Sequence, residues 1–102
     1  MKQINEQEFD QAIKSGVVLV DFFATWCMPC RMMSQILEGV APEIAGKAEI
    51  YKVDVDECEN LARKFGVMSI PTLVFFKDGK EVEKHVGVMQ HADCVNTIKK
   101  YL

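Results

Sequence analysis

The chain has 102 residues and a mass of 11.6 kDa, with 12 Lys and Arg against 15 Asp and Glu, which gives a formal net charge of −3. Hydrophobic residues make up 49% and charged residues 26%, as in an average globular protein, which excludes a disordered, collagen-like or coiled-coil chain. Without a basic excess, nucleic acid and anionic membrane are not expected partners. The length predicts one domain, residues 1–102, with a core that needs no metal or disulfide.

No segment has the pattern of a membrane span or a secretion signal. The longest apolar run, from Val17 to Ala24, contains Asp21 and is far shorter than the roughly 20 residues that cross a bilayer. The N-terminal residues lack the apolar stretch of a signal peptide. We therefore expect a cytoplasmic protein, in which cysteines are more often catalytic or metal-binding than structural.

The first helix and the first long strand are predicted from their end signals and composition. Asn5 followed by Glu8 is a capping-box pattern that starts a helix, and Gly16 is expected to end it in a left-handed conformation. Val17 to Phe23 is rich in β-branched and aromatic residues on both faces. That composition predicts a central strand covered on both sides.

The segment from Cys27 to about Gly46 has the apolar spacing of a long helix. Pro42 cannot donate a hydrogen bond to the carbonyl of Glu38, so we expect a kink or a restart between these two residues. The buried face of this helix is expected to hold Met32, Met33, Ile36, Leu37, Val40 and Ile44.

The second half of the chain predicts a strand at 49–53, a short helix, a hairpin and a final helix. Asp56 and Glu59 form another capping box, which is expected to start the short helix that ends at Gly66. Asp78 and Gly79 predict a two-residue turn between hairpin strands at 72–77 and 80–86. The inner face of the final helix is expected to hold Cys94, Val95, Ile98, Tyr101 and Leu102.

The alternation of β and α elements implies a mainly parallel sheet with helices on both faces, and the hairpin adds an antiparallel edge. With a short first strand at 2–4, we expect a mixed sheet of about five strands and about four helices. The predicted fold class is a three-layer α/β/α sandwich. A fold does not define a function, which has to be argued from a site.

Cys27 and Cys30 are the only two of the four cysteines that lie close together in the sequence. Their spacing at the start of a helix places both on one face, close enough for a disulfide. The helix N-terminus, where Pro29 favours helix initiation, stabilises a thiolate at Cys27, and Cys30 is expected to be less exposed. Cys27 then attacks a substrate disulfide, and Cys30 resolves the mixed disulfide.

A zinc site or an ordinary buried pair is the alternative interpretation of these cysteines. A zinc site commonly takes four ligands as two short-spaced pairs, and this chain has no second pair. Cys58, Cys94, His85 and His91 have no ligand spacing relative to the first pair, so we expect no metal. Cys94 is predicted to be buried and inert, whereas Cys58 is either a core residue or a regulatory thiol near the start of a helix.

Asp21 interrupts an otherwise apolar strand. Burying an ionised carboxylate costs several kcal/mol, so Asp21 should have a raised pKa or perform a task. We expect it to accept the proton of Cys30 through water when Cys30 becomes a nucleophile. The alternative is a carboxylate turned toward a partly solvated strand edge.

The run from Val20 to Cys30, Val-Asp-Phe-Phe-Ala-Thr-Trp-Cys-Met-Pro-Cys, is followed later by Ile70-Pro71-Thr72 and Asp78-Gly79. These motifs, in this spacing, resemble the thioredoxin family over essentially the whole chain. The resemblance implies the thioredoxin fold, with Cys27 as the nucleophile and Cys30 as the resolving thiol.

The resemblance also assigns the residues around the cysteines. Asp21 matches the buried carboxylate of the family, and Lys52 matches the lysine near it. Pro71 matches a cis-proline, although trans is the general rule for a proline at a strand start. The backbone of Ile70 is expected to pair with the substrate chain, and a flat apolar substrate surface is expected at Trp26, Met28, Pro29, Ile70, Pro71 and Gly87.

Three positions depart from the family pattern. Met28 stands where glycine is usual and adds a flexible apolar side chain beside the nucleophile, with an effect on reduction potential or partner docking. Gln35 stands where many members have a proline, and Phe23 replaces a common tryptophan. None of the three removes a group that the chemistry requires.

The expected function is a general protein dithiol–disulfide oxidoreductase, a monomeric electron carrier that reduces disulfide-containing substrate proteins. The resemblance implies that a separate enzyme, thioredoxin reductase, re-reduces it. No bound cofactor is expected, because the chain has no Gly-rich dinucleotide fingerprint and the electrons reside in the Cys27–Cys30 pair. The alternatives are an oxidant or isomerase with the same site, and a non-catalytic binding subunit that uses only the apolar groove.

Overall fold

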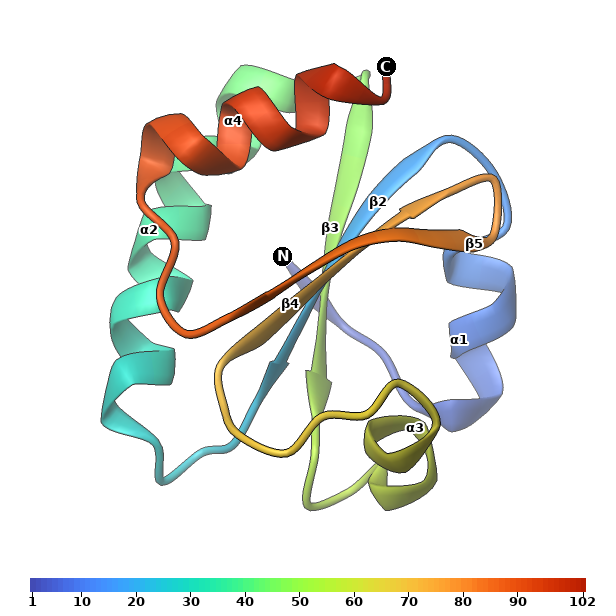
Figure 1. Ribbon diagram of the computed structural model, residues 1–102, viewed down its shortest axis with the longest axis vertical. Helices are drawn as coiled ribbons and strands as arrows, with labels where there is room; N and C mark the ends of the chain where they lie inside the picture. The colour runs from blue at the N-terminus through green and yellow to red at the C-terminus, as the bar shows by residue number, and fades with distance from the viewer.

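Alternating strands and helices build one mixed sheet between two helical layers (Figure 1). The computed structural model describes residues 1–102. In chain order the elements are β1 (Lys2–Gln3), α1 (Glu6–Ala12), β2 (Val17–Phe23), α2 (Met28–Ile44), β3 (Ala48–Asp54), α3 (Glu59–Lys64), β4 (Thr72–Lys77), β5 (Lys80–Val86) and α4 (His91–Lys100). This confirms the predicted sandwich of five strands and four helices. No helix is both long and apolar enough to span a membrane.

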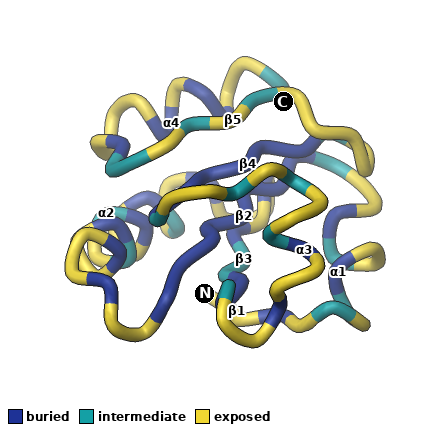
Figure 2. Tube along the Cα trace, turned by 60° about the horizontal axis from the view of Figure 1, so that its bottom comes forward, coloured by how far each residue is buried: buried dark blue, intermediate teal, exposed yellow.

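The strand β2 lies at the centre of the sheet, whose order is β1-β3-β2-β4-β5. It pairs in parallel with β3 on one side and antiparallel with β4 on the other. All seven of its residues are buried, because helices cover both faces of the sheet, and Figure 2 shows β2 and β4 in the buried interior. The prediction of a central strand at Val17 to Phe23 is confirmed.

Two apolar cores fill the space on either side of the sheet. The helices α2 and α4 cover one face and α1 and α3 the other (Figure 1). Side chains alternate between faces along a strand, so Leu19 packs toward α2 and α4, in the core of Leu37 and Ile98, whereas Phe22 packs with Phe9 on the opposite face. Position 21 therefore belongs to the face of α2 and α4.

The hairpin of β4 and β5 follows the predicted ranges and turn. Asp78 and Gly79 both have positive φ, 50° and 86°, as a tight two-residue turn with the twist of the sheet requires. The outer strand β5 is rich in charge and mostly exposed, with Lys80, Glu81, Glu83 and Lys84 along it.

The start of α1 agrees with the prediction, but its end does not. The amide of Glu8 donates to Asn5 Oδ1 at 2.9 Å, and the amide of Asn5 donates to Glu8 Oε1 at 3.0 Å, which completes the capping box. The helix ends at Ala12, so Gly16 is not its cap. Gly16 instead has a φ of 73° in the turn before β2, where its amide donates to Asp78 Oδ1 at 2.8 Å.

The second predicted capping box is wrong. The helix α3 begins at Glu59, and Cys58 precedes it without a side-chain cap. The amide of Asp56 donates to Asp54 Oδ1 at 2.9 Å in the preceding turn, and the carboxylate of Asp56 accepts a hydrogen bond from Trp26 instead. The side chain of Asp56 therefore makes a tertiary hydrogen bond instead of the helix cap that the local sequence pattern predicts.

The helix α2 continues through Pro42 as one element, so the restart, one of the two predicted alternatives, is wrong, and the kink stays a prediction. Leu37, Val40 and Ile44 are buried on both sides of the proline, and their packing holds the helix together despite one lost hydrogen bond. Two residues expected in the core are exposed: Met32 on α2 at 56% and Leu102 after α4 at 51%, the latter because α4 ends two residues earlier.

Candidate functional site

Cys27 and Cys30 form a disulfide at the N-terminus of α2, with their Cα atoms 5.3 Å apart. Cys27 is the N-cap residue, and its Sγ accepts a hydrogen bond from the amide of Cys30 at 3.2 Å. Pro29 lies in the first turn, where a missing N–H costs no helical hydrogen bond. A backbone N–H and the positive end of the helix dipole therefore point at the sulfur of Cys27, as the sequence predicted.

Both cysteines are largely covered in the disulfide form. Cys27 is 5% exposed and Cys30 is 3% exposed, so the expected difference is in the predicted direction but small. The pair packs in a small cluster with Phe23 and Ala24. The Sγ of Cys27 also lies 3.9 Å from the carbonyl oxygen of Ile70, which brings the loop before β4 next to the disulfide.

The peptide bond between Ile70 and Pro71 is cis, as the resemblance implied and the general preference for trans did not. Pro71 is buried, and its carbonyl accepts a hydrogen bond from the amide of Gly87 at 2.8 Å. Ile70 and Gly87 are both half-buried. The structure thus brings the loop before β4 and the end of β5 together next to Cys27.

Exposed apolar side chains surround the disulfide. Trp26 is 69% exposed, Met28 67% and Met68 95%, and Pro29 is exposed as well. A shallow pocket of about 180 Å³ lies beside Trp26 and Met68, and its lining consists of Trp26, Val55, Val67, Met68, Ser69 and Ile70. Val55 and Val67 are not predicted at this surface, because no motif marks either residue and only the folded chain brings them to Trp26.

Asp21 is fully buried in β2, and neither of its carboxylate oxygens has a hydrogen-bond partner. The interpretation as a residue on a solvated strand edge is therefore wrong. Burial raises the pKa of Asp21 from 3.8 to about 7, and the positive charge of Lys52 acts in the opposite direction. Lys52 is the register neighbour of Asp21 on β3, so the two side chains emerge on the same face of the sheet.

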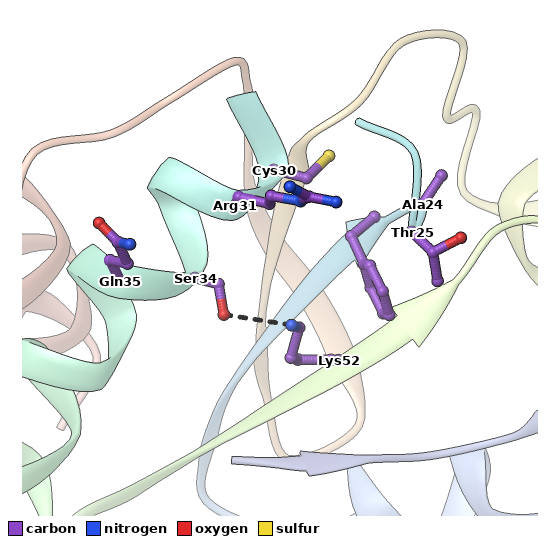
Figure 3. A pocket seen from close by; sticks show the side chains of 8 residues that line it. Ala24, Thr25, Cys30, Arg31, Ser34, Gln35 and Lys52 are labelled. Carbon is purple, nitrogen blue, oxygen red and sulfur yellow. Dashed lines mark hydrogen bonds between the residues drawn. The ribbon is translucent and has the colours of Figure 1, made fainter. Parts of the chain in front are cut away.

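A pocket of about 380 Å³ lies behind Cys30, between α2 and the ends of β2 and β3 (Figure 3). Its lining consists of Phe23, Ala24, Thr25, Cys30, Arg31, Ser34, Gln35 and Lys52. Within it, Lys52 Nζ donates to Ser34 Oγ at 3.2 Å. The sequence analysis missed Ser34, although its spacing of four residues from Cys30 on one helix was a usable signal.

Comparison with known proteins decides the family, because the family model for thioredoxin matches residues 1–100. The chain belongs to the thioredoxin family. It is similar to a thioredoxin from Staphylococcus haemolyticus, with 49% identity over 100 residues that cover 98% of this chain and 96% of the other. A thioredoxin from Staphylococcus aureus is 47% identical with the same coverage.

A solved structure of the thioredoxin family supports the same assignment. A mutant thioredoxin from Halobacterium salinarum has a TM-score of 0.88 and 36% identity to this chain, and the match covers 98% of this chain and 90% of that one. Together with the Cys27–Cys30 disulfide, these relatives make the protein a thioredoxin-type dithiol–disulfide oxidoreductase. The fold class and the general function expected from the sequence are confirmed.

The other two thiols of this family member are free and buried. Burial, more than any other influence, raises the pKa of Cys94 to about 11. Burial and the nearby carboxylates of Glu6, Glu57 and Asp54 also raise the pKa of Cys58, so its place before α3 does not favour a thiolate. The prediction of a buried thiol is confirmed for Cys94, and the basis for a regulatory Cys58 is wrong.

No group of three or more His, Cys, Asp or Glu side chains lies close enough together to hold a metal ion.

Proposed function

We propose that this protein reduces the disulfides of many substrate proteins, with Cys27 as the attacking sulfur and Cys30 as the resolving sulfur. The observation that carries this order is the hydrogen bond from the Cys30 amide to Cys27 Sγ at the start of α2. The same N–H and the helix dipole stabilise a negative charge on Cys27 once the disulfide is reduced.

In the first step the thiolate of Cys27 attacks one sulfur of the substrate disulfide. A bond forms between the two sulfurs, the substrate S–S bond breaks, and the released substrate thiolate takes up a proton. In the second step Cys30 loses its proton and attacks Cys27. The bond between Cys27 and the substrate breaks, the second substrate sulfur leaves as a thiol, and two electrons have passed to the substrate.

Asp21 is the proposed proton acceptor for Cys30, through an intervening water. Its carboxylate is buried and unpaired, and a pKa of about 7 suits a base that works near neutral pH. Lys52, its neighbour on β3, supports the ionised form of Asp21.

The substrate is proposed to bind as an extended segment over the apolar surface around the disulfide. The carbonyl of Ile70 lies 3.9 Å from Cys27 Sγ, which supports its pairing with the backbone of that segment. Further contacts come from the side chains of Trp26, Met28, Pro29 and Pro71 and from the backbone of Gly87. Backbone pairing and flexible methionines favour breadth over strict sequence preference.

A thioredoxin reductase restores the dithiol, so the protein acts in electron transport as a carrier without a bound cofactor. It works as a monomer of one domain, residues 1–102, in the cytoplasm, with neither nucleic acid nor membrane as a partner.

The order of the two cysteines is tested by trapping the mixed disulfide. In Cys30→Ser the first step is intact and the second is blocked, so a covalent complex with a disulfide-containing protein such as insulin should accumulate on a non-reducing gel. Cys27→Ser is the matched control and should trap far less complex. Equal trapping by the two variants would contradict the proposed order.

The direction of electron flow needs a separate measurement. The Cys27–Cys30 pair is equilibrated with glutathione buffers of set potential, and Trp26, the only tryptophan, reports the ratio of dithiol to disulfide. A disulfide that persists in strongly reducing glutathione indicates a reductase. A dithiol that dominates in mildly oxidising buffer would instead indicate an oxidant or isomerase. Met28 bears on this alternative because it stands beside the nucleophile, where glycine is usual.

The third candidate is a binding subunit that needs no thiols. Its test is the double variant Cys27→Ser with Cys30→Ser, which loses all reductase activity if the sulfurs carry the function. Full biological activity of that variant would favour the binding subunit.

A further inference from the structure

Lys52 is held at its tip by Ser34, a residue that the proposed reaction does not use. The ammonium donates to Ser34 Oγ at 3.2 Å and lies 4.3 Å from the centre of the Phe23 ring. Figure 3 shows the hydroxyl of Ser34 directed from α2 across the pocket to Lys52 on β3. Lys52 takes part in no ion pair, although Asp21 is its register neighbour, so the hydroxyl and the ring fix the place of this charge.

We propose that Ser34 is a positioning residue for disulfide exchange, whose hydroxyl keeps the Lys52 ammonium inside the pocket behind Cys30, where its charge stabilises the carboxylate of Asp21. The inference rests on the proposed function only in its link to catalysis, because the effect on Asp21 is a separate observable.

The physical reason lies in the solvation of the ammonium. Lys52 is half-buried and lines an open pocket, and Ser34 is the one hydrogen-bond partner of its ammonium. Without the hydroxyl, the ammonium loses its hydrogen-bond acceptor inside the pocket, so it gains more from moving out into water. A greater distance and a higher dielectric both weaken its field at Asp21.

Other ionisable groups line the pocket or lie near Asp21, and their influence has to be separated from this effect. Cys30 and Arg31 line the pocket from α2, and Cys94 lies on α4 with its pKa raised to about 11, so it stays neutral. On β4 the register neighbour is Leu73, which carries no charge. In the reduced protein Cys30 titrates too, so the carboxylate of Asp21 must be followed directly rather than through activity alone.

The test follows the carboxyl carbon of Asp21 by ¹³C NMR in the reduced protein over a pH series. Ser34→Ala should raise the titration midpoint of Asp21 by about 0.5 unit, which corresponds to a roughly threefold loss of the ionised form below the midpoint. Ser34→Thr keeps the hydroxyl and should restore the original midpoint. Alanine is the best helix former, so Ser34→Ala should not disrupt α2 and should leave the thermal unfolding midpoint of the protein unchanged.

Gln35→Ala is the matched control on the same helix. Gln35 lines the same pocket, but its side chain makes no hydrogen bond to Lys52 and points away from it in Figure 3. This variant should leave the midpoint of Asp21 unchanged. A shift as large as that of Ser34→Ala would mean that the midpoint responds to any change in the pocket wall, which would overturn the proposal.

A double-mutant cycle decides whether Ser34 acts through Lys52. In a Lys52→Met background, Ser34→Ala should no longer move the midpoint. The proposal is overturned if Ser34→Ala alone leaves the midpoint unmoved or shifts it downward. It is also overturned if Ser34→Ala shifts the midpoint equally in the Lys52→Met background.

Single-turnover resolution of a mixed disulfide separates this inference from the proposed function. If Asp21→Asn resolves at the normal rate while Ser34→Ala still moves the midpoint, the proton-acceptor role of Asp21 fails and the positioning of Lys52 stands. If Asp21→Asn slows resolution while the midpoint in Ser34→Ala stays constant, the role of Asp21 stands and the role of Ser34 fails.

Discussion

Trp26 and Asp56 are joined by a hydrogen bond from the indole Nε1–H to Oδ2 at 2.8 Å, across 30 residues of sequence. The bond ties the residue before Cys27 to the loop between β3 and α3. It holds an exposed indole, 69% accessible, in one orientation beside the disulfide. An ordered aromatic surface loses less conformational entropy when a substrate covers it.

Asp56→Ala should therefore weaken substrate binding more than chemistry. The net value of one hydrogen bond is about 1 kcal/mol and less at an exposed site, so we expect KM for a disulfide protein to rise about two- to fivefold with little change in kcat. Steady-state reduction kinetics measure both. Asp56→Asn keeps an acceptor oxygen and should lie close to the parent, and equal losses in the two variants would show that the charge matters rather than the bond.

Asp21→Asn should stabilise the fold in a pH-dependent way. Because burial raises the pKa of Asp21 from 3.8 to about 7, the folded protein holds a proton between these values that the unfolded chain has lost. Stability therefore falls as pH rises through this window and is lowest above about 7. This rise in the pKa corresponds to at most about 4 kcal/mol of stability.

Urea unfolding of the oxidised protein from pH 4 to pH 8 measures this difference. The advantage of Asp21→Asn should be near zero at pH 4 and should grow to its full value at pH 8. A gap that stays constant with pH would mean that the carboxylate does not titrate in this range.

The thiols of the reduced protein should differ strongly in reactivity. Cys27 should oxidise first with dilute peroxide at pH 7, because the N-terminus of α2 favours its thiolate. Cys58 and Cys94 are buried and their pKa values are raised, so both should stay unmodified until the chain unfolds. Mass spectrometry of peptides after brief exposure locates the oxidised sulfur, and modification of Cys58 at the rate of Cys27 would restore a regulatory role for it.

Phe76→Ala should destabilise the fold without changing the redox chemistry. The Phe76 ring is buried against Phe9 and Phe65, at centroid distances of 5.7 and 5.3 Å, on the face of the sheet away from Asp21. We expect a loss of about 3–5 kcal/mol in chemical denaturation and an unchanged glutathione equilibrium. Val82→Ala, on exposed β5, is the control and should cost less than about 1 kcal/mol.

Local patterns sufficed where the sequence and the packing agree. The two-sided apolar composition of β2 and the Asp78–Gly79 turn each define one structure, and both ranges were predicted to the residue. The Cys27–Cys30 pair at a helix start indicates redox chemistry from the sequence alone. The cis bond before Pro71 required the family resemblance, because trans is the general rule.

The errors arose where distant parts of the chain compete with a local signal. Asp56 stands in the sequence pattern of a helix cap, but in the fold its carboxylate accepts a hydrogen bond from Trp26. Pro42 has the sequence of a helix break, but the buried residues around it keep α2 continuous. The bond between Ser34 and Lys52 depends on how α2 packs over β3, which no short motif encodes.

The charged outer strand of the sheet protects this protein from aggregation with its substrates. A protein that reduces disulfides binds chains that become partly unfolded. An unprotected edge strand would pair with such chains and form mixed aggregates. Along β5, Lys80, Glu81, Glu83 and Lys84 make that edge a poor template for a further strand. We therefore expect a substrate chain to pair with the short stretch at Ile70 instead, and to leave it once the substrate sulfurs are reduced.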